Sequence, residues 1–367
     1  MDFTYSEEQQ MLADSLRRFV ASEYTFDKRR TMARERASFD RSIWSALAEM
    51  GILGISVPTE HEGFGEGPAT QLVVHRELGR ALVQEPVIPA LIATTILTHH
   101  APAQLKAELL PALTRGDTVL AVAYLEPTTR YRADTARSTA RKQDHGHVLT
   151  GTKSVVWHGN AADAYLVSAQ LDGALALFLV QRDAPGLTVS AYPTIDRLSG
   201  ADLHLADVPA TLVTANGLDA LDTGIDHGIA AQCAAAAGAM ERLIEITAEY
   251  LATRKQFGKP LASFQALQHR MADMVIQKEL ALSMAYVAAQ GLDATDAAER
   301  RRKVSAAKVV TAKAGRFVGQ QAVQLHGGMG MTDELEVGDY FKALTMVDVL
   351  LGDTDLHLER YGTAMAA

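Results

Sequence analysis

Apolar residues change their spacing twice along this chain of 367 residues, and that change limits the possible folds more than any other feature. Up to about residue 115 they recur at helical intervals, and from about Gly224 onwards the helical period returns. Between Thr118 and Asp222, short runs of valine, leucine and threonine are separated by glycine, proline and aspartate, a pattern typical of β-strands. The order predicts a multi-domain α+β protein.

We expect three domains on this basis. They are an N-terminal helical domain at 1–115, a middle β-barrel or sandwich at 116–222, and a C-terminal helical bundle at 223–367. Ser6-Glu7-Glu8-Gln9 is a capping-box pattern and predicts that the first helix begins there. Alanine-rich helices that can pack closely as a bundle are expected near 225–254, 262–291, 297–325 and 334–349, with a last helix after Gly352.

Composition excludes several classes of function. The net charge of −9 argues against a nucleic-acid-binding surface. No apolar run reaches the roughly 18 residues of a membrane span, and no secretory signal is visible, so we expect a cytoplasmic protein. Cys233 is the only cysteine and is predicted to be a buried, inert thiol. Neither a metal-ligand spacing of histidines nor a Rossmann or Walker glycine pattern occurs, so no metal site is predicted.

Two segments carry the residues best suited to a ligand. They are Arg254-Lys255-Gln256-Phe257-Gly258 and Gln324-Leu325-His326-Gly327-Gly328-Met329-Gly330, and each is expected to end a long helix. An arginine can bind two phosphate oxygens at once, and glycines let backbone amides approach a flat ring. Together they suit a pyrophosphate and an adenine. The alternative interpretation is that Arg254 only complements a helix dipole and that the glycines only cap a helix.

At these residues the sequence resembles the flavin-dependent acyl-CoA dehydrogenase family, from Phe3 to about Tyr361. Within that family it is most similar to the small subunit of the pimeloyl-CoA dehydrogenase type, whose partner is a larger homologous subunit. The resemblance implies FAD as the cofactor, an acyl-CoA thioester as the substrate, and an electron acceptor that reoxidises the reduced flavin. It also implies a site shared between subunits.

In the family's tetramers one chain supplies the flavin-ring pocket and the catalytic Glu, and its neighbour supplies the two motifs quoted above. By this resemblance Arg254 would bind the pyrophosphate and Phe257 would pack on the flavin. Contacts to the distal half of the cofactor would come from Gln265, Gln324, Gly327 and Gly328. This chain keeps the groups that are lent to a neighbour.

The groups that a family member uses in its own cleft are largely missing. The two family positions for the catalytic Glu hold Leu351 and Gly228, and neither residue can accept a proton. Asp353 is a possible substitute base, although an aspartate there also suits the start of the last helix. A free carboxylate is a weak base at neutral pH, so such a base needs a site that raises its pKa.

The flavin-ring motifs differ as well. Leu125-Glu126-Pro127 replaces a Thr-Glu-Pro motif and so loses the hydroxyl donor, and Val155-Val156-Trp157 moves the aromatic residue of a Trp-x-Thr motif by two positions. Asp226 matches a CoA-contacting aspartate of the family, whereas its companion arginine position is Ile229. We expect Trp157 to be mainly a packing residue of the β domain.

Three hypotheses follow. The first is that the chain is the catalytically incomplete small subunit of a heterotetramer and completes the FAD site of its partner. The second is a self-sufficient homotetrameric dehydrogenase with Asp353 as base. The third is a structural subunit that has lost flavin. The identity of the acyl chain is not determined by these residues.

Overall fold

The computed structural model describes residues 5–34, 39–144 and 146–366. Phe3, where the family resemblance begins, lies outside them. The chain forms two compact units. Unit 1 comprises Met1–Arg30, Pro68–Val83 and Ile229–Ala367, and unit 2 comprises Thr31–Gly67 and Gln84–Gly228. The division into three domains at residues 115 and 222 stays a prediction.

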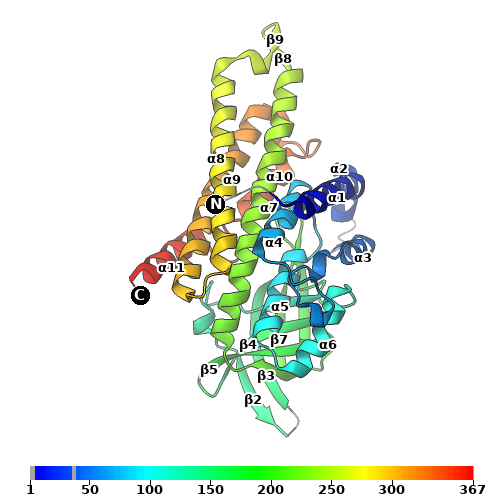
Figure 1. Ribbon diagram of the computed structural model, residues 1–367, viewed down its shortest axis with the longest axis vertical. Helices are drawn as coiled ribbons and strands as arrows, with labels where there is room; N and C mark the ends of the chain where they lie inside the picture. The colour runs from blue at the N-terminus through cyan, green and yellow to red at the C-terminus, as the bar shows by residue number, and fades with distance from the viewer. Residues whose placement is uncertain (1–4, 35–38, 145, 367) are drawn as a thin grey trace. The chain divides into compact units, whose positions relative to one another are not determined.

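Unit 2 contains a closed β-barrel, which confirms the predicted β-rich middle region. Pairing runs from β4 to β2, β3, β7 and β5 and returns to β4, while β1 pairs with β4 and β6 pairs with β7 (Figure 1). Alternate side chains fill the interior, so Leu149, Tyr165, Phe178 and Leu203 are completely buried. The strands are β1 (Leu120–Ala123), β2 (Thr139–Gln143), β3 (Gly146–Trp157), β4 (Ala164–Leu171), β5 (Ala174–Gln181), β6 (Leu187–Pro193) and β7 (Ser199–Thr214).

Helices of unit 2 accompany the barrel. The Asp40 carboxylate accepts the Ser42 amide at 2.8 Å and so caps α3, and the buried Trp44 of this helix donates its indole N–H to Gly116. Helix α5 packs on β1, which explains why nearly all of its side chains are apolar or buried. The elements are α3 (Arg41–Glu49), α5 (Val87–His100), α6 (Ala103–Thr114), the 3₁₀ turns η1 (Ile52–Gly54), η2 (Thr59–His61) and η3 (Ala133–Thr135), and the beginning of α7.

Unit 1 is helical, as the sequence predicts. The capping box at Ser6 is confirmed, because Ser6 and Gln9 exchange hydrogen bonds of 3.2 Å. Cys233 is fully buried, as expected, and burial raises the pKa of its thiol. The elements are α1 (Glu7–Glu23), α4 (Pro68–Arg80), most of α7 (Gly217–Thr253), β8 (Lys255–Gln256), β9 (Lys259–Pro260), η4 (Leu261–Ser263), α8 (Gln265–Leu292), α9 (Ala297–His326), η5 (Gly327–Met331), α10 (Val337–Met346) and α11 (Thr354–Ala366). Helix α2 (Phe26–Arg34) crosses from one unit to the other.

Helices α4 and α7 approach one another through glycines. An added Cβ on Gly79 would lie 2.0 Å from the Ala235 carbonyl oxygen, and one on Gly238 would lie 1.9 Å from that of Arg76. Any larger residue would therefore push the helices apart. Helices α8 and α9 pack along their length beside α7 (Figure 1).

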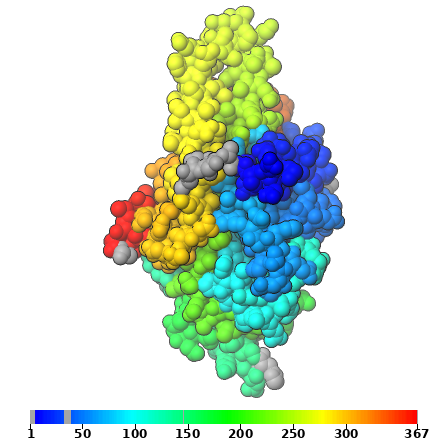
Figure 2. All heavy atoms as spheres, in the orientation of Figure 1, coloured from blue at the N-terminus to red at the C-terminus, as the bar shows by residue number. Residues whose placement is uncertain are grey.

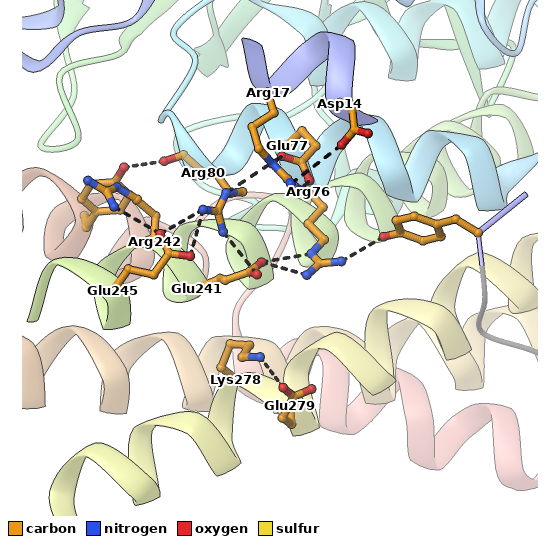
Figure 3. Close-up of polar contacts among 12 residues, drawn as sticks. Asp14, Arg17, Arg76, Glu77, Arg80, Glu241, Arg242, Glu245, Lys278 and Glu279 are labelled. Carbon is orange, nitrogen blue, oxygen red and sulfur yellow. Dashed lines mark hydrogen bonds and ion pairs between the residues drawn. The ribbon is translucent and has the colours of Figure 1, made fainter. Parts of the chain in front are cut away.

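An ion-pair layer joins α1, α4 and α7, and we call it the paired arginine layer (Figure 3). Every guanidinium in it has a carboxylate within 3.1 Å. Glu77 is only 1% exposed and binds Arg17 with two hydrogen bonds, of 2.6 and 3.1 Å. The layer consists of Arg17, Arg76, Arg80 and Arg242 with Glu77, Glu241 and Glu245.

None of the helices in the described ranges combines the length and apolar character that a membrane crossing requires. The same ranges contain no cluster of three or more His, Cys, Asp or Glu side chains suited to a metal ion.

Candidate functional site

The first motif forms a small hairpin between α7 and α8. Lys255 pairs with Pro260 and Gln256 with Lys259, and the two turn residues, Phe257 and Gly258, have φ angles of 53° and 79°. Two consecutive positive φ angles are what a tight hairpin of the primed type requires. The Arg254 carbonyl accepts the Leu261 amide at 2.8 Å and closes the base of the hairpin. This segment, yellow-green in Figure 2, is uncovered on the face drawn there.

The second motif ends α9 and is fixed by an aromatic stack. The rings of Tyr250 and His326 lie 4.3 Å apart at an angle of 28°. The Nδ1 atom of His326 donates to the Ala322 carbonyl at 2.8 Å, and burial lowers the pKa of this histidine. His326 is thus a packing and hydrogen-bonding residue. The stack sets the position of the glycines that follow.

The two motifs line one groove of about 650 Å³. Arg254, Gln324, Gly327 and Gly328 all lie in its wall, so the structure brings these four predicted residues together. Phe257 and Gln265 are not among the lining residues. The lining also includes residues that the sequence analysis did not name: Tyr250, Leu261, Ala266, Leu267 and Arg270. The remaining lining residues belong to the two motifs and are Gln256, Leu325, His326 and Met329.

The charge on Arg254 is not compensated within the described part of the chain, where no hydrogen bond or ion pair engages its guanidinium. Arg254 directly follows the last residue of α7, and a cation at the C-terminal end of a helix interacts favourably with the helix dipole. This interaction is one reason for an arginine at position 254. A bare guanidinium in a groove is nevertheless suited to an anionic ligand, since it offers five N–H donors.

The two glycines of the second motif face open space. An added Cβ on Gly327 or Gly328 would meet no atom within 4 Å. Gly327 needs to be glycine for its backbone, because its φ angle is 59° and its ψ angle −138°. Gly328 has no such requirement, so packing inside the chain does not explain it. A ligand that approaches the backbone closely does explain it.

Phe257 is at the tip of the hairpin and is 90% exposed, with only an edge-to-face contact to Phe264 at 6.2 Å. Gln265 is the first residue of α8 and is also exposed. Their roles toward a flavin stay predictions.

The loop after α10 holds Leu351 at the first family position for the catalytic Glu. The buried ammonium of Lys308 donates to the carbonyls of Val347 and Leu350, the latter at 2.6 Å, and also to the Gln232 side chain. Burial lowers the pKa of His357 to about 4, and its Nε2 donates to the Leu351 carbonyl at 3.0 Å. These hydrogen bonds hold the backbone of the loop, and the Leu351 side chain is buried.

The other predicted catalytic and substrate residues lie as follows. The Asp353 carboxylate accepts the Leu356 amide at 2.9 Å at the start of α11, which is the helix-start role expected of it. Gly228 and the fully buried Asp226 lie on α7 within unit 2. Whether Asp353 acts as a base stays a prediction.

In the barrel, Glu126 of the altered motif has a structural role that the sequence analysis missed. It lies 2.6 Å from Lys153, and both side chains are buried. Burial favours the neutral carboxyl, but Lys153 and the amides of Arg137 and Ser138 hold the pKa of Glu126 below its ordinary value. Removal of either charged partner would leave the other buried alone. Trp157, at the end of β3, is partly buried.

Comparison with known proteins identifies the family. Models of the acyl-CoA dehydrogenase N-terminal, middle and C-terminal domains match residues 6–117, 121–208 and 215–366. The chain belongs to the acyl-CoA dehydrogenase family. These enzymes are oxidoreductases that act on CH–CH groups and depend on FAD.

The relatives span the whole chain. Acyl-CoA dehydrogenase FadE27 of Mycobacterium tuberculosis is 31% identical, over 100% of this chain and 99% of its own length. The structure of the ChsE4-ChsE5 complex from the same organism superposes with a TM-score of 0.89 at 30% identity, covering 100% of this chain and 99% of that one. A variant of the Tcur3481-Tcur3483 steroid ACAD gives a TM-score of 0.90 at 30% identity, covering 98% of each chain.

The groove has the features that part of an FAD site requires. Arg254 offers an uncompensated cation, and the backbone at Gly327 and Gly328 leaves a space that a Cβ would partly fill. These features fit the diphosphate and adenosine end of FAD. No general base for the α proton of a thioester is found at position 351.

Proposed function

We propose that this chain is the smaller, catalytically incomplete subunit of a heteromeric acyl-CoA dehydrogenase. Its groove binds part of the FAD of a larger homologous subunit, and the chain carries out no dehydrogenation in its own cleft. The observation that carries the proposal is a one-sided loss. The groove at the ends of α7 and α9 keeps residues that the family resemblance assigns to nucleotide binding, while a buried leucine occupies the family position of the base.

In the complex, the partner would supply the base and the pocket for the flavin ring, and FAD would supply the acceptor for a hydride from the β carbon of the acyl-CoA. Arg254 would neutralise the diphosphate, and Gln324 would donate to or accept from the adenosine end. Gly327 and Gly328 would admit the ligand to the backbone, and Phe257 would cover part of the flavin. An electron acceptor would then reoxidise the flavin. The two-chain assemblies named among the relatives support a heteromeric arrangement.

The test is expression of this chain alone and together with a larger homologous subunit. We expect the co-expressed complex to bind FAD and to oxidise an acyl-CoA thioester, and the isolated chain to have no such activity. The variant Arg254→Met in this chain should remove most of the FAD from the complex without preventing assembly. Arg141→Ala is the control, because it removes the same charge from an exposed pair in the barrel.

Two outcomes would contradict the proposal. A yellow, fully active homotetramer of this chain would support the self-sufficient enzyme instead, and loss of that activity in Asp353→Asn would identify its base. An unchanged FAD content in Arg254→Met would support the flavin-free structural subunit.

A further inference from the structure

The groove contains a second arginine that the family motifs do not include. Arg270 is on the second turn of α8 and lines the same groove as Arg254. Its Nη1 donates to the Oε1 atom of Gln321 on α9 at 3.3 Å. That partner is neutral, and within the described ranges no carboxylate pairs with Arg270. The bond orients the guanidinium and leaves its Nε and Nη2 donors available.

Two guanidiniums that pair with no carboxylate among the described residues lie in one groove of this chain. It carries a net charge of −9, and each arginine of the paired arginine layer has a carboxylate close by (Figure 3). Like charges in one groove repel each other, and the repulsion is relieved when an anion lies between them. The surplus of positive charge therefore matches a ligand with more than one negative charge.

We propose that Arg270 is a second phosphate-binding residue, so that the groove takes a diphosphate group with one guanidinium for each phosphate. The inference rests on the proposed function and extends it, since it assigns a residue and a ligand chemistry to the same site. The planar fork of Arg270 can bind two oxygens of one phosphate, which a lysine cannot do. The ligand chemistry is that of an adenosine diphosphate group, which FAD and coenzyme A both contain.

Binding of ADP and AMP to the full chain, measured by calorimetry, tests the inference. We expect the unaltered chain to bind ADP more tightly than AMP. Arg270→Met should weaken ADP binding by roughly 10- to 100-fold and remove most of the preference over AMP, because one charge-assisted pair is lost. Arg270→Lys should keep only part of the affinity, and Arg141→Ala should change neither constant.

Failure of the inference can be distinguished from failure of the proposed function. If the unaltered chain binds no ADP at millimolar concentration, or if Arg270→Met binds ADP as tightly as the parent, the inference is wrong. If the FAD content of the co-expressed complex falls in Arg254→Met while Arg270→Met changes neither ADP binding nor FAD content, the proposed function stands without it.

The co-expressed complex also separates the two sources of the diphosphate. A lower FAD content in Arg270→Met assigns the group to FAD. A higher KM for the acyl-CoA with unchanged FAD content assigns it to coenzyme A. Either result supports a diphosphate at Arg270, and the absence of both changes contradicts it.

Discussion

Unit 1 uses arginine in two contrasting ways. In the paired arginine layer, Arg17, Arg76, Arg80 and Arg242 each meet a carboxylate of the same chain, and Glu77 is almost completely buried among them. In the groove at the ends of α7 and α9, the described residues offer Arg254 and Arg270 no such partner. The first set stabilises the packing of α1, α4 and α7. The second set leaves positive charge in the groove that an anionic ligand can compensate.

The largest effect should come from the buried carboxylate of the paired arginine layer. Glu77→Ala removes the partner of Arg17 and leaves Arg80 with less compensation, so we expect a loss of about 3 kcal/mol in the free energy of unfolding. Urea denaturation measures it. Nucleotide binding should not change. Glu60→Ala, at a carboxylate that is 78% exposed, is the control. A loss below about 1 kcal/mol would contradict the idea that this layer holds the helices together.

Arg254→Met should show the opposite pattern. We expect ADP affinity to fall by about 10- to 100-fold, equivalent to about 1.4–2.8 kcal/mol, because a charge-assisted hydrogen-bonding pair is lost. The unfolding free energy should stay within about 0.5 kcal/mol of the parent, since no internal partner is removed. Calorimetry and urea denaturation measure the two quantities. A large loss of stability would show that Arg254 belongs with the structural arginines.

The pH dependence of the unfolding free energy should reveal the contribution of Glu241 in the paired arginine layer. Burial alone would raise the pKa of Glu241, but the charges of Arg76 and Arg80 hold it below its ordinary value of 4.5. A carboxyl whose pKa is lower in the folded state stabilises the fold above pH 4.5, and this stabilisation is lost as the pH falls through the folded-state value. The urea midpoint of the parent should therefore fall more steeply between pH 5 and 3 than that of Glu241→Gln. Equal slopes would contradict the assignment.

The smallest effect should come from an exposed pair. Arg141 and Asp207 lie 2.7 Å apart, but each is 63% exposed, so solvent screens their attraction. Arg141→Ala should leave the urea midpoint and ADP binding unchanged. A clear change in ADP binding would show that the overall charge of the chain, and not the groove, controls nucleotide affinity.

The parts of the fold that depend on local patterns were predictable from the sequence. The capping box at Ser6 and the helical periods after Gly224 are set by residues a few positions apart, and the structure confirms both. The closure of the barrel between β4 and β2 rests on one pair, Thr139 and Gln170, and has no local pattern. The predicted groove residues came from two motifs that the helices α7 and α9 bring together.

Contacts between distant positions were not predictable from the sequence. Arg76 and Arg80 meet glutamates 165 positions away, and a charged helix face looks the same in sequence whether or not another helix compensates it. The sequence analysis did not select Arg270 for a related reason. Its significance depends on the fact that no carboxylate of the described residues pairs with it, and this is known only from the fold. The burial of Glu126 with Lys153, which are 27 positions apart, likewise depends on the barrel.

The backbone of the loop around Leu351 is held by contacts that do not involve the side chain at position 351. Its shape depends on Lys308 and His357, which bind backbone carbonyls and take nothing from the side chain at position 351. A substitution there can therefore remove a proton acceptor while the neighbouring backbone keeps its course. A change at position 351 alone would not produce the incomplete site proposed above, because Leu125, Trp157 and Ile229 depart from the family motifs as well.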